Sequence, residues 1–268
     1  MNRPSTGFPA LARACAVVGA RDVFAEQTWF TWTAGWLMRV VLQVTFFALL
    51  GSYVGGTGQT RYLLIGGAAN VAALEALTVM LYSAHDRLGG TLPLLVAAPR
   101  DYFLVLLSRY PNCVVTGTLT SSIALLSCPL LVGVHLEYPR ALLAVPVIAL
   151  GATATYVFGG FLGGIVIKVR SGRWLLLNIG WMSMAILCGF TIRVGYWPAP
   201  LTWLAQILPF THALRALRGV LGDATVALIV GQCALEAAVA VLWFVVGRSV
   251  LGLTIERARR DGSIQLSS

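Results

Sequence analysis

The amino-acid sequence predicts an all-α integral membrane protein with six transmembrane helices in a single domain, residues 1–268. Composition is the first observation: 58% of the residues are hydrophobic, 11% are charged, and the mean hydropathy is +0.82. A soluble globular domain does not have this balance. Length is the second observation. Because a helix needs about 20 apolar residues to cross the hydrocarbon core, the chain has room for about six spans with short loops, and an attached ATPase, protease or kinase domain is excluded.

The N-terminal part predicts a helix on the membrane surface, followed by two spans. Residues 8–30 mix apolar and charged side chains at spacings that favour an amphipathic helix at the cytoplasmic interface. Two apolar runs follow, 36–54 and 62–83, and the turn sequence GGTGQTR (55–61) separates them. We expect these runs to be the first and second spans.

The rest of the chain predicts four more spans and one broken region. We expect the spans at 113–134, 141–167, 174–192 and 225–247, and a polar cytoplasmic tail at 248–268. Three prolines interrupt residues 194–224, so we expect one or two short re-entrant or interfacial helices there. Two overlapping GxxxG patterns, Gly159 with Gly163 and Gly160 with Gly164, predict close helix packing in the fourth span.

The basic residues predict the orientation. The net charge of +9 comes from 18 arginines and one lysine against ten acidic residues. In the six-span arrangement, 14 of these 19 basic residues fall on one side and 5 on the other, and the side richer in Arg and Lys is cytoplasmic. We therefore expect both termini in the cytoplasm and no nucleic-acid partner. The Ala-, Arg- and Gly-rich composition with one lysine favours the plasma membrane of a bacterium.

The segment Asp86–Pro99, DRLGGTLPLLVAAP, lies between the second and third spans and is too short to cross a bilayer. Asp86 is a favourable N-cap, apolar residues recur at helical spacing from Leu88 to Val96, and Pro99 ends the pattern. A short cytoplasmic helix tied to two spans suits docking into a groove of a partner protein. An ordinary loop helix lying on lipid is the alternative.

Three features together resemble the ABC-2 permeases, the membrane subunits of ATP-binding-cassette exporters. They are the stretch DRLGGTLPLLVAAPRDYF (86–103), the stretch LPFTHALRALRGVLGD (208–223), and the layout of an amphipathic helix, six spans and a short basic tail. The resemblance implies an efflux subunit that moves a hydrophobic or amphipathic substrate, such as a drug, lipid, glycolipid or peptide, outward by alternating access. It also implies that a coupling helix contacts the ATPase through these residues: Asp86, Arg87, Gly90, Thr91, Leu92, Leu95 and Pro99.

The resemblance implies partners as well. The chain has no GxxxxGK[ST] loop to hold nucleotide phosphates, so we expect no enzyme activity and no cofactor on this chain. ATP and Mg²⁺ belong to separate cytoplasmic ABC ATPase subunits. Six spans form half of a translocation path, which implies a dimer with a second permease subunit, surrounded by membrane lipid. The second subunit is either a copy of this chain or a homologue. Asp86 replaces the family's usual glutamate and Pro93 replaces a common second acidic residue, which favours the hypothesis of a heterodimer, with a homodimer as the alternative.

Four charged residues are further candidates. Glu75 and Glu236 lie inside predicted spans, where a carboxylate costs about 2.5–3.5 kcal/mol, so both should face protein or water. They suit a proton relay or a substrate cation site, and hydrogen bonds between helices explain them equally well. Arg215 and Arg218 share one helix face and suit an exit-side anion site; a solvated basic face at the lipid headgroups is the alternative. No His/Cys cluster predicts a metal site or a catalytic set.

Large side chains in the first and fifth spans are candidates for the substrate path, with core packing as the alternative: Trp36, Phe46, Phe47, Tyr53, Met182 and Phe190. A different class of function is an ion-gradient-driven secondary transporter in which Glu75 and Glu236 carry protons. That class predicts broken spans at matching places in two inverted halves, and the sequence has no such repeat. A lipid-modifying intramembrane enzyme would need a catalytic set near one interface, and none is visible.

Overall fold

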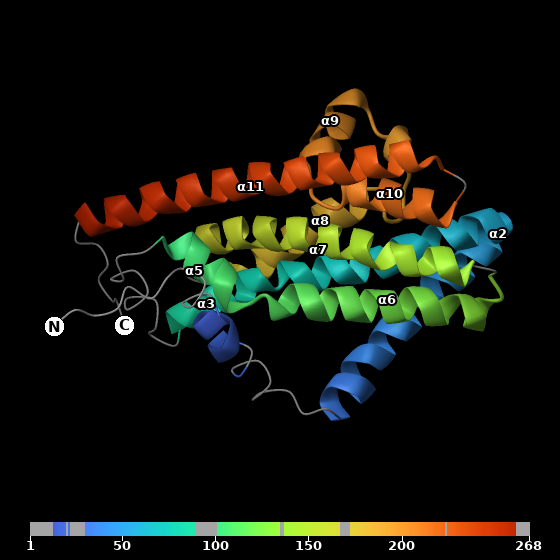
Figure 1. The fold of residues 1–268 in the computed structure, drawn as a ribbon, viewed down its shortest axis with the longest axis horizontal. Coiled ribbons are helices and arrows are strands. Elements are labelled where there is room, and N and C mark those ends of the chain that lie inside the picture. Colours follow the sequence, from blue (N-terminus) through green and yellow to red (C-terminus); the bar gives the residue numbers. More distant parts are fainter. Residues whose placement is uncertain are drawn as a thin grey trace.

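The computed structural model describes residues 13–19, 21, 30–88, 101–134, 137–166, 172–222 and 224–260, and only the backbone of 31–33, 84–88, 138, 254–255 and 257–260. These residues form helices joined by turns, with no strand among them (Figure 1). The predicted all-α class is therefore confirmed. The main elements are the π-helical η1 (Thr31–Leu37), α2 (Met38–Leu77), α3 (Val79–Leu88), α5 (Tyr102–Arg109), α6 (Asn112–Val132), α7 (Tyr138–Val166), α8 (Arg173–Leu187), the 3₁₀ turn η2 (Val194–Tyr196), α9 (Ala199–Ile207), α10 (Thr211–Leu221) and α11 (Val226–Arg260).

Helix α2 is a hairpin of two legs. Gly56 breaks its helical geometry with φ 69° and ψ −161°, a conformation that a residue with a Cβ adopts only under strain. The legs meet directly beyond this break, because a Cβ on Gly51 would lie 2.8 Å from the Cα of Thr60. Nine residues of straight helix would separate them by about 13.5 Å. The chain therefore reverses inside the predicted 55–61 turn, and the second leg is already helical where the turn was expected to continue.

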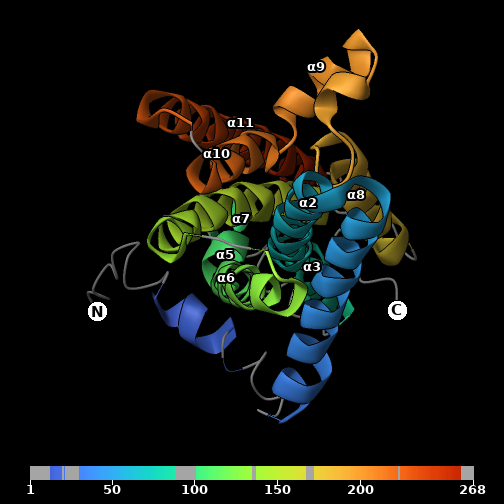
Figure 2. The ribbon, with the colours of Figure 1, turned by 90° about the vertical axis from the view of Figure 1, so that its right-hand side faces the viewer.

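The second leg of α2 is the centre of the bundle, and α11 lies at its edge. Among the 18 most apolar consecutive residues of segment 34–83, 83% are buried. Among the corresponding 18 residues of α11, 11% are buried. The second leg with its continuation α3 packs against α6, α7 and α8. Figure 2 shows this leg surrounded by neighbouring helices, with α11 on the outside beside α10. Many exposed side chains of α11 are apolar, which is compatible with a helix that faces lipid.

The glycines of α7 let it contact helices on two faces. A Cβ on Gly159 would lie 3.3 Å from the Cα of Leu77, and one on Gly163 would collide with Ser83, so this face touches α2 and α3. On the other face, a Cβ on Gly160 would lie 3.2 Å from the Phe103 ring in α5, and Gly164 contacts Leu251 in α11. The close packing predicted from the two GxxxG patterns is present, and each pattern serves a different partner.

The region between α8 and α11 is broken into short pieces, as the three prolines predicted. α8 ends at Leu187, short of the predicted boundary at 192, and Gly189 with φ 92° follows it. α9 and α10 then form two short helices; α9 projects from the bundle, while α10 packs against α7 and α11 (Figures 1 and 2). α11 continues past the predicted end of the sixth span at 247 to Arg260.

Four helical segments of the described chain are long and apolar enough to cross a membrane. They are 34–83, Asn112–Val132, Pro139–Val166 and Val226–Leu253. These segments are compatible with the membrane protein predicted from composition. α8 has 15 residues, about 22 Å of helix, and is shorter than a hydrocarbon core of about 30 Å. Of the predicted amphipathic segment 8–30, residues 13–19 and 21 are helical, and Gly19 contacts the backbone carbonyl of Arg109; Phe30 is also described, and the remainder lies outside the described residues.

Candidate functional site

The predicted coupling segment connects α3 to α5. Asp86 and Arg87 belong to the last turn of α3, where the structure describes the backbone. The other candidate coupling residues, Gly90, Thr91, Leu92, Leu95 and Pro99, lie outside the described residues. The structure describes the backbone of α3 before this segment and the helix α5 after it.

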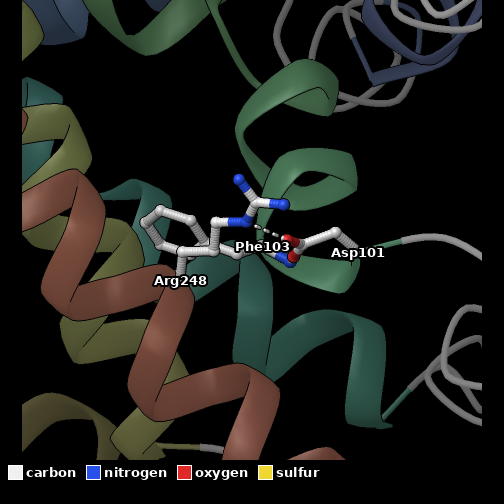
Figure 3. Close-up of polar contacts among 3 residues, drawn as sticks. All are labelled: Asp101, Phe103 and Arg248. Carbon is white, nitrogen blue, oxygen red and sulfur yellow. Dashed lines mark hydrogen bonds and ion pairs between the residues drawn. The ribbon is translucent and has the colours of Figure 1, made fainter.

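The downstream attachment is an ion pair and a helix cap at Asp101. Its Oδ1 accepts a hydrogen bond of 3.0 Å from the backbone N–H of Phe103, which caps α5, and its Oδ2 accepts one of 2.6 Å from Nε of Arg248. Figure 3 shows Arg248 extending from α11 towards this carboxylate. The pair is partly solvated, with 24% of the Asp101 side chain and 56% of the Arg248 side chain exposed, so its net contribution to stability is about 1 kcal/mol or less.

Apolar contacts fix α5 more firmly than the ion pair does. Phe103 is fully buried, its ring centroid lies 5.6 Å from that of Phe244, and a Cβ on Gly247 would approach the ring to 2.6 Å. Fully burying a phenylalanine side chain is worth about 1.5–3 kcal/mol. The chain that follows the predicted coupling segment is therefore packed firmly against α11 and α7. The sequence offered one signal for this, an aspartate directly before the apolar run YFLVLL, which is typical of a helix N-cap.

Glu236 holds the N-terminus of α10. Its Oε1 accepts a hydrogen bond of 2.6 Å from the backbone N–H of Phe210, and its Oε2 accepts bonds from the N–H groups of His212 (3.1 Å) and Ala213 (2.9 Å). These are N–H groups that the first turn of a helix leaves without partners of its own. Glu236 is completely buried, so the carboxylate replaces solvent for this helix end. Of the two roles considered for Glu236, the hydrogen-bonding one has direct geometric support.

The same contact surface includes His212. Its Nδ1 lies 2.9 Å from Oε1 of Gln232 on α11, and its Nε2 lies 3.2 Å from the backbone carbonyl of Gln206 on α9. Thr211 donates a 2.6 Å hydrogen bond to the carbonyl of Ala205. α9, α10 and α11 are thus joined by buried polar contacts as well as by packing.

Glu75 has a different environment. It is 9% exposed, and its Oε1 is buried without a hydrogen-bond partner among the described residues. The Trp36 indole and the Arg39 guanidinium lie near its carboxyl, and Arg39 stacks on the Trp36 ring with 4.0 Å to the centroid. The structure therefore brings together Trp36, a candidate for the substrate path, and Glu75. It does not bring Glu75 together with Glu236 in any recorded contact of the described chain.

Arg215 and Arg218 make separate contacts. Arg215 donates to Oε1 of Gln206 at 2.9 Å. Arg218 stacks on the Tyr62 ring, 3.6 Å from its centroid, and both Arg218 and Tyr62 donate hydrogen bonds to the carbonyl of Gly189. These contacts join α10 to α2 and to the end of α8. The two guanidinium groups thus hold the outer region together, and the exit-side anion site stays a prediction for this pair.

The candidate substrate-path residues lie in two kinds of environment. Phe46, Tyr53 and Met182 are 62%, 91% and 47% exposed, and Phe47 packs edge-on against Phe46. Phe190 is 1% exposed and its ring lies 5.5 Å from that of Phe210, inside the core. Exposed residues of the first leg and of α8 remain candidates for a path or an interface. Phe190 contributes to packing in this conformation.

No group of three or more His, Cys, Asp or Glu residues with metal-binding geometry occurs in the described part of the chain, and the five cysteines are free thiols. The chain matches no protein-family model, no curated protein and no solved structure.

Proposed function

We propose that this chain is the permease subunit of an ATP-driven exporter of the ABC-2 type. In this proposal it moves an amphipathic substrate outward by alternating access, and a separate cytoplasmic ATPase supplies the energy. One observation carries the proposal: the chain that follows the coupling segment is locked onto α11 by Asp101, Phe103 and their contacts. A partner that pushes on residues 86–99 would therefore move the start of α5 and α11 together.

The proposal includes six membrane crossings. They are the two legs of α2, then α6, α7, α8 and α11. The reversal at Gly56 supports two crossings within residues 34–83, since each leg has its own contacts and opposite direction. α8 alone is too short to cross the membrane. In this proposal the non-helical residues 188–193 extend the fifth crossing beyond the end of α8. This count places the α3–α5 connection, the turn before α8 and both termini on the cytoplasmic side, in agreement with the excess of basic residues there.

A second permease subunit belongs to the proposal because large apolar surfaces of the described bundle are left exposed. Large apolar side chains on the first leg of α2 and on α8 are exposed, including Phe46, Tyr53, Ile179 and Met182. In a membrane these surfaces contact lipid or another subunit. The hypothesis of a heterodimer, based on Asp86 and Pro93, makes the partner a homologous chain.

A secondary transporter is the other candidate, and Glu75 is the observation in its favour. Its buried, unpartnered oxygen is the kind of group that takes up a proton or a cation. Glu236 gives this candidate less support, because both of its oxygens already accept hydrogen bonds from the backbone. The secondary transporter considered above requires both Glu75 and Glu236 to carry protons. The permease is therefore the preferred function.

Copurification tests the proposed partner. The double substitution Leu92→Asp and Leu95→Asp should abolish copurification of an ABC ATPase with this chain, because charges would replace the apolar stripe that docks. Leu94→Asp is a control in the same segment: it adds one negative charge on the opposite side of the predicted helix, and it should retain the ATPase. If the double variant inserts into the membrane as the wild-type chain does and still retains all of the ATPase, docking by this segment is refuted.

A further inference from the structure

A cavity lined by both polar and apolar residues lies at the end of the bundle opposite the α3–α5 connection. Its volume is about 550 Å³, and it lies between the turn of the α2 hairpin and the end of α6. Gly56 and Gly133, both with positive φ, form parts of its wall, and Ser52, Thr57, Thr60 and Arg61 supply its polar side chains. None of these residues was a candidate at the level of the sequence.

Among the described residues that line this cavity, Arg61 is the charged one. It is half-buried and makes no hydrogen bond or ion pair with any residue that the structure describes. Other arginines of the described chain are paired: Arg140 with Glu137, Arg215 with Gln206 and Arg218 with Gly189. A guanidinium carries five N–H donors, and withdrawing them from water without acceptors is costly.

Two of the three hydroxyl groups in the described lining of the cavity already donate hydrogen bonds within the protein. Ser52 donates to the carbonyl of Leu49 at 2.7 Å, and Thr60 donates to the carbonyl of Gly56 at 2.8 Å. Thr57 has no such partner in the described structure and is exposed to the cavity. Thr57 and Arg61 are four residues apart on the second leg, so both lie on one face of the helix. The free donors of the cavity therefore lie on one face of the second leg.

The electrostatic surroundings favour an anion. Among the described residues that line the cavity there is no carboxylate. Of the described acidic residues near this end, Glu137 pairs with Arg140, and Glu236 accepts hydrogen bonds from the backbone of α10. Two further arginines, Arg193 and Arg218, flank the ring of Tyr62, the residue next to Arg61. A concave surface lined by one sign of charge concentrates ligands of the opposite sign.

We propose that this cavity binds a phosphate group, with Arg61 as the bidentate donor and Thr57 as a third donor. Arginine matches the geometry of phosphate oxygens, and charge-assisted hydrogen bonds of this kind are about twice as strong as neutral ones. The phosphate belongs either to the headgroup of an anionic lipid or to a free phosphate ester. The proposal does not depend on an ATPase partner, so it stands or falls separately from the proposed function.

Native mass spectrometry of the purified full-length chain tests the proposal with phosphatidylglycerol and phosphatidylcholine as probes. The wild-type chain should bind phosphatidylglycerol more tightly than phosphatidylcholine, and Arg61→Gln should weaken the binding of phosphatidylglycerol at least about tenfold, since about tenfold is the loss expected for one charge-assisted contact and the bidentate guanidinium makes two. Thr57→Val, which keeps every charge, should weaken it by a similar factor. Arg140→Gln removes an arginine that is already paired with Glu137 and should bind as the wild type does.

Competition by glycerol 3-phosphate and inorganic phosphate separates the two sources of the ligand. Displacement of the lipid by either compound, lost in Arg61→Gln, supports a site for free phosphate as well; binding of the lipid without displacement supports a headgroup site. If the melting temperature shows that Arg61→Gln does not fold, the binding of phosphatidylglycerol by Thr57→Val tests the proposal instead. Undiminished phosphatidylglycerol binding by both variants, or equal loss in Arg140→Gln, would overturn the proposal.

Discussion

At the scale of single residues, the buried carboxylate of Glu236 shows how a charge is accommodated in an apolar bundle. Three backbone N–H groups at the start of α10 surround it, and Phe210 adopts a left-handed conformation (φ 72°) directly before that helix. A buried N–H without an acceptor costs about 1–3 kcal/mol. Glu236 therefore stabilises the entry into α10, and with it the position of the whole outer region.

The substitution Glu236→Gln should destabilise the protein by about 2 kcal/mol, because the amide nitrogen cannot accept and leaves at least one N–H unpaired. Thermal unfolding of the purified protein measures the effect. Glu256→Gln, at an exposed position of the same helix, serves as the control and should change stability by less than about 0.5 kcal/mol. If Glu236→Gln keeps wild-type stability but transport stops, the carboxylate acts on a proton or substrate instead of on α10.

At the scale of elements, α5 is the helix that follows the predicted coupling segment and packs on the bundle. It has eight residues and packs on α7 through Gly160 and on α11 through Gly247 and Phe244. Two glycines thus create the space for one ring, that of Phe103. An ion pair at the surface aligns α5, while the buried ring supplies most of the attachment energy.

The substitution Gly247→Ala should separate α5 from α11 and cost about 1–3 kcal/mol, because the new methyl group would lie 2.6 Å from the Phe103 ring. Gly252→Ala is the matched control in the same helix, since nothing lies within 4 Å of its Cβ position. The control should leave stability unchanged or raise it, through better helix propensity. Equal melting temperatures for the two variants would contradict the close packing of α5 on α11.

At the scale of the whole molecule, composition and length predicted the class, and spacing predicted several elements. Apolar runs indicated α6 and α7 to within a few residues, and three prolines indicated the broken region between α8 and α11. Local patterns carry such information because they report which surfaces avoid water. Gly56 illustrates the limit: the glycine-rich turn was visible, but not which glycine reverses the chain.

The contacts that define the sites could not be predicted in the same way. Glu236 meets a helix end 24 residues earlier in the chain, Arg248 meets a carboxylate 147 residues away, and Arg218 meets Tyr62 on another helix. Sequence spacing relates neighbours along one helix and says nothing about which helices adjoin. α5 was not predicted for a further reason: its eight residues are too few for a membrane span. Gly247, against which its Phe103 ring packs, has no sequence feature that distinguishes it from other glycines of a span.

The most direct test of the permease account is ATP hydrolysis by the membrane complex purified through a tag on this chain. The account predicts hydrolysis in the wild-type complex, its loss when Leu92 and Leu95 are replaced by Asp, and its retention in Leu94→Asp, because this chain itself has no phosphate-binding loop. ATP hydrolysis at the wild-type rate in the double variant would contradict the permease account. So would a wild-type complex that hydrolyses no ATP and still transports substrate along a proton gradient.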